Sequence, residues 1–440
     1  MIRVHSISNK SQAKPEALLN DCVDGFAAGT DDNAVFALDY TLQQDYLPDA
    51  PELGLFALVA LEKSAKGVRV ALTITPKTES LLQSVDALQV GSAAARRWAE
   101  HQGLAWLELD KPLRLQPVYI PKPWGREIWY TGIEARGQSS VMDESGRAIP
   151  LPWLLSLCPQ RLLAGDGRQP VLLKILDPLP DPVLGDLYFE MHEEKREVYV
   201  VTHVDRAAWP DGTGGIRFGF NQQKRAASPS DEAFKDDYLA AVNAYRAVRV
   251  QIDEQLDRYR KENDIAPDAP VPPETLRQWL VGIPTTLRER EAELRAAMDA
   301  FVHVDPLGVG DVVKVPCYTP HSLLHGVRTV EFQTPVYERK ILSFAQKVLT
   351  QPHWDTATAM DQVSLEPPAK IELPVMAADD GFQLEEVAVF EDFRVERLTL
   401  KAGRSCTLGK GDAYCLLMAV SGQLSVNERR LGAEEAALVP

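Results

Sequence analysis

Cysteine is scarce in this sequence of 440 residues: the five are Cys22, Cys158, Cys317, Cys406 and Cys415. No two of them form a C-x-x-C pair, so neither a disulfide framework nor a zinc knuckle is indicated. For Cys317, the cysteine nearest to the candidate site described below, a small buried apolar role is more typical than a nucleophilic one.

Positive charge is also in short supply, because 47 Lys and Arg are set against 63 Asp and Glu, giving a net charge of −16. Nucleic acids and anionic membranes bind basic surfaces, so we expect neither as a partner, and an anionic substrate needs local Lys and Arg. The chain has no apolar run of about 18 residues, and its beginning lacks the apolar core of a signal peptide. We therefore expect a cytoplasmic protein.

A phosphate-binding glycine loop is missing as well. The segment DGTGGIRFG at 211–219 has neither the Lys-Ser/Thr pair of a Walker loop nor a strand-to-helix context. A loop between strands is expected there. What remains is the composition of an ordinary soluble globular protein, 45% hydrophobic and 25% charged, and its length suggests two to four domains.

The first 112 residues are predicted to form a small α/β domain. Strand patterns cover 33–42, 53–61 and 67–76, a helical run covers 78–102, and a further strand covers 104–109. In the third strand Val68, Val70, Leu72 and Ile74 share one parity and therefore one face. The segment concentrates neither His nor carboxylates, so it predicts no activity.

A helical insertion is predicted for residues 228–302. Ser228-Pro229-Ser230-Asp231 is a helix start, with Ser228 as the expected N-cap. A proline-rich break follows at 266–273, and a second helix is expected at 286–301. Apolar residues recur mostly at three and four positions, which predicts one buried face: Phe234, Tyr238, Ala241, Tyr245, Val248, Ile252 and Tyr259.

Two β segments on either side of this insertion carry a candidate metal site. The segments 190–199 and 310–339 are typical of β-hairpins, and they contain Glu190, His192, Glu197 and His321. Alternate side chains of a strand share a face, so Glu190 and His192 can point at one ion, with Glu197 joining from across a turn. Imidazole and carboxylate ligands without a thiolate suit a borderline divalent ion.

The spacing of these residues resembles the two signature motifs of the cupin β-barrels: Glu190-x-His192-x4-Glu197 first, then Gly310, five intervening residues, Pro316, and His321 five positions further on. The order of parts from about residue 117 onward is similar to that of type I phosphomannose isomerases, the zinc-dependent cupins that interconvert mannose 6-phosphate and fructose 6-phosphate. The family's Lys and Asp before the metal motif have counterparts in Lys174 and Asp177.

This resemblance implies a mainly β fold class: cupin (jelly-roll) barrels with a helical insertion, beside the small α/β N-terminal domain. A metal-binding cupin domain is expected at 113–350 and a second cupin-like β domain at 365–440. The sequence has no His after residue 353, so the second domain is expected to be metal-free.

The resemblance also implies roles for individual residues. The metal ligands are Glu190, His192, Glu197 and His321, and the cofactor is one divalent ion, zinc in the first place, with manganese, iron, nickel or cobalt as alternatives. The proton-handling residues are Lys195 and Glu331, with Arg339 as a positive group near the reacting sugar. The residues expected to bind the small-molecule sugar phosphate are Lys174, Arg196 and Arg339.

Three departures separate the chain from the family. Glu190 stands where the family has Gln, Tyr318 replaces a turn glycine, and the loop between Glu331 and Arg339 is shorter. Two other functional classes therefore stay open beside a sugar-phosphate isomerase. One is a cupin metalloenzyme of another type, such as an oxygenase, epimerase or lyase, and the other is a sugar-binding regulator without catalysis. The sequence does not predict the oligomeric state.

Overall fold

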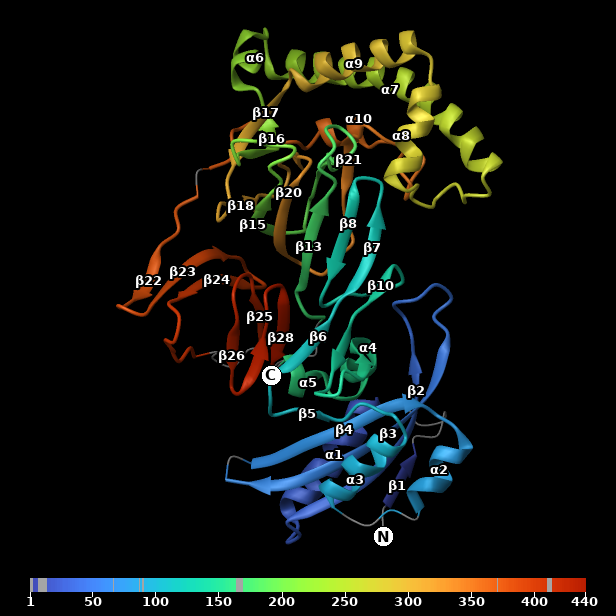
Figure 1. Ribbon diagram of the computed structural model, residues 1–440, viewed down its shortest axis with the longest axis vertical. Coiled ribbons are helices and arrows are strands. Elements are labelled where there is room, and N and C mark those ends of the chain that lie inside the picture. Colours follow the sequence, from blue (N-terminus) through green and yellow to red (C-terminus); the bar gives the residue numbers. More distant parts are fainter. Residues whose placement is uncertain are drawn as a thin grey trace. The chain divides into compact units, whose positions relative to one another are not determined.

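The structure is a computed structural model that describes residues 3–6, 14–65, 67–86, 88, 91–163, 169–369, 371–409 and 414–440 (Figure 1). The chain divides into two compact units. The first comprises residues 1–119, 129–173 and 407–440, and the second comprises residues 120–128 and 174–406. The predicted domain boundaries near residues 112, 350 and 365 remain predictions. None of the helices in the described part of the chain combines the length and apolar composition of a membrane span.

The first unit contains the predicted α/β segment. Its five-stranded sheet has the order β1 (Arg3–Ser6), β2 (Asn33–Gln43), β3 (Glu52–Ser64), β4 (Gly67–Pro76) and β5 (Leu107–Glu108), with β1 parallel to β2 and the described pairs of the other strands antiparallel. Phe56 and Leu58 on one face pack with Trp98 of α3 (Ser92–His101). Helix α1 (Pro15–Ala28) contacts β2 and β3.

The helix predicted at 78–102 is interrupted, which corrects the prediction of one continuous helix. The structure has α2 (Glu79–Asp86) and α3, and Gly91 before α3 lies at a φ of 138°. Side chains with a Cβ rarely adopt that conformation, so the glycine permits a break that the periodicity did not reveal.

A second sheet of the first unit joins residues from distant parts of the chain. Its order is β12 (Ala148–Pro150), β11 (Ser140–Met142), β6 (Leu113–Gln116), β28 (Glu435–Val439) and β25 (Cys415–Ala419). The unit also contains the short pairs β9 (Ile133–Glu134) with β10 (Gly137–Gln138) and β26 (Leu424–Val426) with β27 (Arg429–Leu431), and the helices α4 (Leu151–Leu157) and α5 (Pro159–Leu163).

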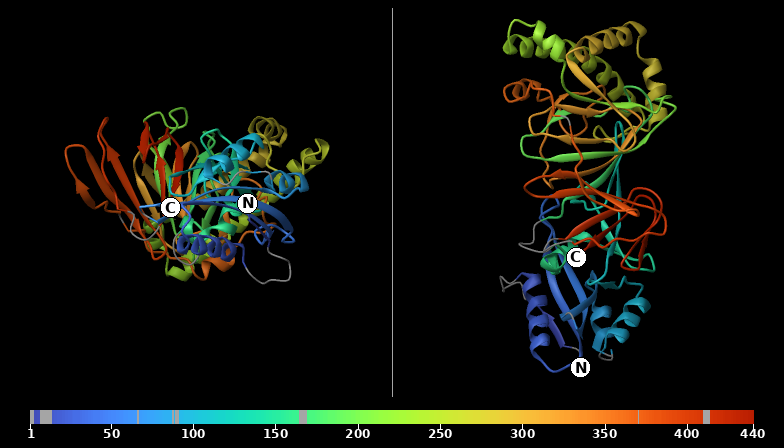
Figure 2. Two further views of the ribbon diagram at one scale, coloured as in Figure 1. Left: turned by 90° about the horizontal axis from the view of Figure 1, so that it is seen from below. Right: turned by 90° about the vertical axis from the view of Figure 1, so that its left-hand side faces the viewer.

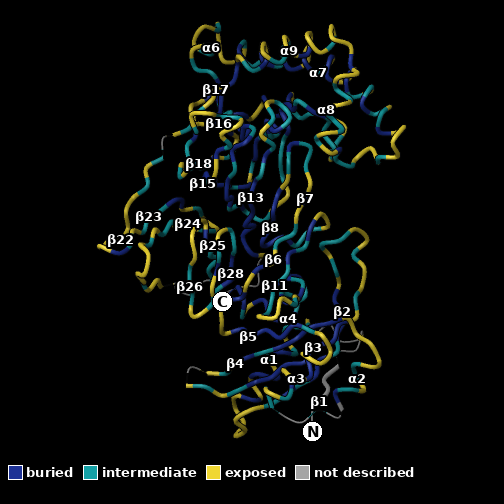
Figure 3. Tube along the Cα trace, in the orientation of Figure 1, coloured by how far each residue is buried: buried dark blue, intermediate teal, exposed yellow. Residues whose placement is uncertain are grey.

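Two packed sheets form the body of the second unit. One has the order β18 (Val312–Val315), β15 (Glu197–Val204), β20 (Val327–Gln333), β13 (Leu172–Pro178), β8 (Gly125–Trp129) and β7 (Val118–Lys122). The other has the order β17 (Val302–Leu307), β16 (Gly214–Phe220), β19 (His321–Leu323), β14 (Phe189–Met191) and β21 (Lys340–Ser343). Figure 3 shows the inner strands in the dark blue of buried residues.

The core of this unit lies between the two sheets. Tyr199 and Val201 of β15 pack in one buried cluster with Ile216 and Phe218 of β16 and Leu323 of β19. This is the arrangement of a β-sandwich closed into a barrel, in which inward-facing residues of both sheets interdigitate. The predicted fold class is confirmed: mainly β with a cupin-like barrel, a helical insertion and a small α/β part at the N-terminal end.

The prediction that the metal segments are β-hairpins is wrong. Strand β14 pairs with β19 and β21, whereas β15 pairs with β18 and β20 of the other sheet. Strand β19, which carries His321, likewise belongs to the five-stranded sheet. The strands before and after it in the chain, β18 and β20, belong to the six-stranded sheet. The chain therefore crosses from sheet to sheet at 192–196, and this crossing brings ligands from both sheets together.

The helical insertion consists of α6 (Gln222–Ala227), α7 (Asp231–Glu262), α8 (Pro273–Gly282) and α9 (Thr285–Asp299), which lie together on one side of the two sheets (Figure 2, right). Phe234, Tyr238 and Tyr245 of α7 are buried against Phe220 and Leu342 of the five-stranded sheet. The N-cap is Ser230 and not the predicted Ser228, because the Ser230 hydroxyl accepts a hydrogen bond from the Ala233 amide. Ser228 ends α6 instead.

The remaining described elements of this unit follow the barrel. Helix α10 (Thr356–Met360) packs in the same buried cluster as α7. Strands β22 (Val375–Ala378), β23 (Phe382–Val389) and β24 (Arg394–Leu400) form a three-stranded sheet, in which Val395 and Ala388 pack on Val198 of β15. Strand β22 is exposed along its whole length (Figure 3).

Candidate metal centre

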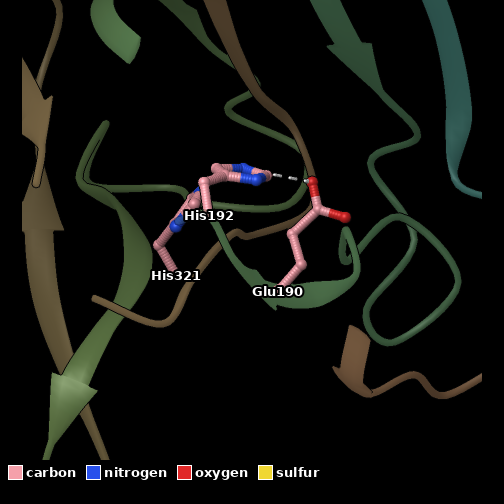
Figure 4. Close-up of side chains that lie close together, drawn as sticks. All are labelled: Glu190, His192 and His321. Atoms are coloured by element: carbon pink, nitrogen blue, oxygen red, sulfur yellow. Dashed lines mark ion pairs between the residues drawn. The ribbon is translucent and has the colours of Figure 1, made fainter. Parts of the chain in front are cut away.

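The four predicted ligands converge inside the barrel of the second unit. Glu190 of β14 is the direct cross-strand partner of His321 of β19, and His192 follows the end of β14 (Figure 4). Glu197 begins β15 on the opposite sheet. The exposed fractions are 0% for His192, 2% for Glu197 and 3% for His321, so an ion here would be largely shielded from water.

The donor atoms are spaced as a bound ion requires. One ligand atom each of Glu190, His192 and His321 lies within 4.8 Å of the other two. Oε2 of Glu197 lies 3.4 Å from Nε2 of His192 and 3.2 Å from Nε2 of His321. Oε1 of Glu190 lies 3.9 Å from Nε2 of His192, the pair joined by the dashed line in Figure 4. Ligands about 2.1 Å from a tetrahedral ion are about 3.4 Å apart, so these separations fit one small cation.

Main-chain carbonyl groups orient both imidazoles. Nδ1 of His192 lies 2.9 Å from the carbonyl oxygen of Glu338, and Nδ1 of His321 lies 3.1 Å from that of Thr319. A carbonyl oxygen only accepts, so each Nδ1 carries the proton and Nε2 keeps its lone pair when the ring is neutral. Burial, together with the charge of Lys195, lowers the pKa of His192 and favours this neutral ring.

A lone pair and a carboxylate repel each other unless a proton or a metal ion lies between them. Nε2 of His192 is buried without a hydrogen-bond partner among the described residues, and Glu190 and Glu197 supply the nearest oxygens. Buried polar atoms are otherwise almost always paired in native proteins. The donor set therefore fits a divalent ion held by Glu190, His192 and His321, with Glu197 as the fourth ligand.

Glu197 is also tied to two neighbours that compete for its oxygens. Lys195 Nζ lies 2.6 Å from Oε1, and the Tyr199 hydroxyl donates a 2.7 Å hydrogen bond to Oε2. Burial alone would raise the pKa of Glu197, but Lys195 and His192 outweigh it and hold that pKa well below its usual value. The sequence analysis did not select Tyr199, although its parity with Glu197 in one strand is the signal for it.

A second buried pair lies beside these ligands. Nζ of Lys174 on β13 is 3.2 Å from Oε2 of Glu331 on β20, and both side chains are buried. Neither Glu331 oxygen has an aligned hydrogen-bond donor among the described residues. Burial first, and then the negative charges of Glu197 and Glu127, raise the pKa of Glu331 well above its usual value, against the opposing effect of Lys174 and Lys195. A raised pKa brings a carboxyl group closer to the range in which it both accepts and gives up a proton near neutral pH.

Three neighbouring carboxylates stabilise the positive charge of Lys174. Burial opposes that charge, but Glu127, Glu331 and Glu197 outweigh burial and raise its pKa above the usual value. Glu127 of β8, which also pairs with Lys122 at 3.2 Å, was not selected by the sequence analysis. A single carboxylate in an aromatic strand gave no signal, because its partners lie on other strands.

Arg339 joins the centre, whereas Arg196 does not. Nη1 of Arg339 lies 3.3 Å from Oε2 of Glu190, and its guanidinium stacks 4.7 Å from the centre of the Tyr188 ring. Burial alone would raise the pKa of Glu190, but Arg339 and His192 outweigh burial and lower that pKa below its usual value. The guanidinium of Arg196 instead lies 3.0 Å from Glu391 and 3.5 Å from Asp392, so its predicted role in substrate binding remains a prediction.

Comparisons with known proteins match this chain by structure alone: no protein-family model and no curated protein sequence matches it. The structure is similar to the mannose 6-phosphate isomerase from Bacillus subtilis, with a TM-score of 0.50 and 14% identity over 75% of this chain and 93% of that one. A zinc-bound mannose 6-phosphate isomerase matches with a TM-score of 0.51 and 14% identity, over 74% of this chain and 94% of that one. A point mutant of phosphomannose isomerase from Salmonella typhimurium gives the same values. At this identity the likeness establishes the fold, which this chain shares with the phosphomannose isomerases.

Proposed function

We propose that this protein is a metal-dependent aldose–ketose isomerase that acts on a sugar phosphate, in the first place mannose 6-phosphate and fructose 6-phosphate or a related sugar. The observation that carries the proposal is the pairing of two adjacent features in the barrel. One is the buried cluster of His and Glu donors, and the other is the Lys174–Glu331 pair, in which burial and neighbouring carboxylates raise the pKa of the carboxyl group. The solved structures of similar fold bear the same activity in their names.

One divalent ion per chain is proposed, with zinc as the first choice. Glu190, His192 and His321 would hold it, with Glu197 as the fourth ligand. When bound, the ion would supply a Lewis acid that stabilises negative charge developing on the sugar oxygens. The two ligand carboxylates match its double charge, and this match offsets the cost of burying a cation.

Proton transfer between C1 and C2 needs a group that both accepts and returns a proton. Glu331 suits this role, since a carboxyl group with a raised pKa exchanges protons efficiently near neutral pH. Lys174, held charged 3.2 Å away, would stabilise the carboxylate that forms when Glu331 gives its proton up. Lys195, 2.6 Å from Glu197, is the second proposed proton-handling residue.

Arg339 is the proposed anchor for an anionic part of the substrate. Its guanidinium is held by Glu190 and by a 2.6 Å hydrogen bond to the Thr350 hydroxyl, and it lies over the ring of Tyr188. Nε of Arg339 is buried without an acceptor among the described residues, so one donor remains for a ligand. A fixed guanidinium binds phosphate or carboxylate with little loss of side-chain entropy.

Deuterium exchange tests the reaction class directly. Metal-replete protein is incubated in heavy water with mannose 6-phosphate, fructose 6-phosphate and other hexose and pentose phosphates, and NMR follows deuterium entry at C1 or C2. We expect exchange that disappears with a chelator and returns with zinc. Because exchange requires only proton abstraction, it detects the reaction even where the product does not accumulate. Metal-replete protein that exchanges no carbon-bound hydrogen in any of these sugars would rule the isomerase out.

A second candidate follows from the ligand set. If Glu197 stays with Lys195 and Tyr199 and does not bind the ion, Glu190, His192 and His321 make up two imidazoles and one carboxylate, the facial set that non-haem iron oxygenases use. The carboxylate is that of Glu190, which stands where the phosphomannose isomerases have Gln. Oxygen consumption by the ferrous protein in the presence of sugars or sugar acids would favour this candidate, and oxygen consumption no faster than that of free iron would exclude it.

A further inference from the structure

A cavity lies in the second unit, between the helical insertion and the barrel. It has a volume of about 380 Å³, which falls in the range of small-molecule sites, roughly 300–1,000 Å³. Helices α7, α8 and α9 form one wall, and the barrel loops 182–184 and 345–347 form the other, together with Pro123. Its described lining includes none of the proposed metal ligands or proton-handling residues. It is a separate site from the metal centre.

Part of the helical wall of this cavity is apolar. Ile252 and Leu256 come from α7, and Leu276, Trp279 and Leu280 come from α8. The Trp279 ring lies 5.6 Å from that of Tyr259, which supports it from behind. An aromatic or aliphatic group would therefore be buried against this part of the wall, and removing its apolar surface from water favours binding.

Cations outnumber carboxylates around the cavity. Five cations line it: Arg249, Arg260, Arg288, Arg295 and Lys347. The carboxylates within ion-pairing distance of them in the described chain are three: Asp253 beside Arg249 at 2.9 Å, Asp257 beside Lys347 at 2.7 Å, and Glu291 beside Arg295 at 3.3 Å. This local excess of positive charge stands against a net charge of −16 for the whole protein.

Two of the five cations rely on neutral acceptors. Arg260 donates hydrogen bonds to the carbonyl groups of Ala266 and Ala269. Its ion pair with Asp257 is long, at 3.7 Å. Burial lowers the pKa of Arg260 in spite of the attraction of Asp257 and Asp253. Arg288 donates to the carbonyl of Ile283 and to the hydroxyl of Thr285. Arg288 is exposed. A guanidinium whose donors meet neutral acceptors, or a carboxylate only at long range, gains from an anionic ligand.

The barrel wall adds a strained residue. Val183, which lines the cavity, has a φ of 71°. A β-branched residue rarely adopts this conformation, and strained residues of this kind cluster at ligand clamps and active sites. The strain is consistent with a loop held in position for a ligand.

We propose that this cavity binds a small organic anion, with its apolar body against Trp279 and Leu256 and its carboxylate, sulfonate or phosphate among the excess guanidinium groups of Arg260 and Arg288. The site is independent of the proposed isomerase reaction, because it shares none of the residues proposed for that reaction. Its ligand class differs too, since the helical wall favours an apolar body over a sugar.

Two fluorescent probes of one shape test both parts of the proposal. The probes are 8-anilinonaphthalene-1-sulfonate and its uncharged analogue N-phenyl-1-naphthylamine, titrated into the full chain. We expect the sulfonate to bind at about one per chain and to raise the unfolding temperature, as a ligand of the native state does. Arg288→Glu should weaken sulfonate binding about tenfold and leave the uncharged analogue within about twofold. Ala292→Trp, which fills the lining, should remove both probes.

Matched controls lie on the same helix. Arg290→Glu makes the same charge change at a residue that pairs with Glu293 and does not line the described cavity, and Ala297→Trp adds the same bulk at an exposed position outside that lining. Both controls should bind the probes like the native chain. The proposal is overturned if the sulfonate does not raise the unfolding temperature, if Arg290→Glu weakens it as much as Arg288→Glu, or if Ala292→Trp still binds it.

Discussion

Nδ1 of His192 lies 2.9 Å from the carbonyl oxygen of Glu338, and the side chain of the same glutamate holds the turn that follows His192. Its Oε2 accepts hydrogen bonds from the backbone amides of Glu193 at 2.9 Å and Glu194 at 3.2 Å. One residue therefore orients a metal-ligand candidate and fixes the segment on which the chain crosses between the two sheets. The sequence analysis did not select Glu338, since its partners lie more than 140 positions away.

Glu338→Ala should weaken zinc binding about 10- to 100-fold, the loss expected when a partner behind a ligand is removed. The backbone amides of the turn lose their acceptor, so His192 and Glu197 are held less firmly. A competitive titration with a chelator of known affinity measures the change. Glu338→Gln keeps an acceptor oxygen and should retain most of the affinity. Equal affinities for the native chain and the alanine variant would show that the turn is held without Glu338.

His321→Ala should remove most of the bound metal. The protein is expected to carry about one divalent ion per chain, and a lost ligand costs more than the 10- to 100-fold of a supporting residue. Elemental analysis after dialysis gives the metal content. His303→Ala is the matched control, because His303 is an exposed histidine paired with Asp305. Native protein that neither holds nor regains metal would contradict the proposed centre.

The sequence predicted which side chains come together better than it predicted how their strands pair. Alternation and motif spacing placed Glu190, His192 and His321 in strands or at their ends, and the structure brings them together. The hairpin prediction failed because spacing along the chain does not record which sheet a strand joins. Only long-range pairing, such as Glu190 with His321, decides that.

Helical periodicity predicted which face of a helix is buried, but it did not predict where the helix begins. The stripe on α7 depends on one face meeting a core, so Tyr238 and Tyr245 were predicted as buried and are buried. Helix ends depend on local bonds of single residues. Ser228 and Ser230 are both good N-caps in composition, and only the hydrogen bond to Ala233 distinguishes them. Glu127, Tyr199 and Glu338 depend on contacts across strands, which one sequence does not reveal.

Ile252→Asp should destabilise the protein by several kcal/mol, since it places an unpaired charge in the buried stripe of α7. Val250→Asp is the matched control, because Val250 lies on the same helix and is 43% exposed. Its effect should stay within about 0.5 kcal/mol. Urea unfolding of both variants measures the difference. Similar midpoints for the two would show that the stripe is not buried.

Asp186 should make stability depend on pH in the acid range. Burial alone would raise its pKa, but the hydrogen bond with His325 and the charge of Arg217 lower the pKa to about 2. The folded-state pKa is below the unfolded value of about 3.9, so the stabilisation is complete above pH 4 to 5 and is lost as the pH falls towards 2. We expect a contribution of about 2 kcal/mol.

Urea unfolding at pH 5, 4 and 3 tests this contribution. The gap in unfolding free energy between the native chain and Asp186→Asn should narrow as the pH falls, because the protonated native carboxyl group then resembles the amide. Asp211→Asn, at an exposed aspartate, should show a constant gap. A constant gap for Asp186→Asn as well would show that this carboxylate is not stabilised by His325 and Arg217.

Glu331→Gln should separate proton transfer from metal binding. Burial and neighbouring carboxylates raise the pKa of Glu331 in the folded protein. Glutamine has the size of a protonated glutamic acid and also presents NH donors, so the buried site beside Lys174 should accept it and the fold should remain. Deuterium exchange into a sugar phosphate should nevertheless fall about 10²- to 10⁴-fold, the contribution of a positioned acid–base group.

Zinc content of the Glu331→Gln variant should stay at one ion per chain, since Glu331 is not among the proposed ligands. His321→Ala, by contrast, should lose exchange and zinc together. If Glu331→Gln loses the metal as well, Glu331 supports the ligands and the proton-transfer role falls to Lys195; if exchange is undiminished, neither the carboxyl group nor its raised pKa serves the reaction.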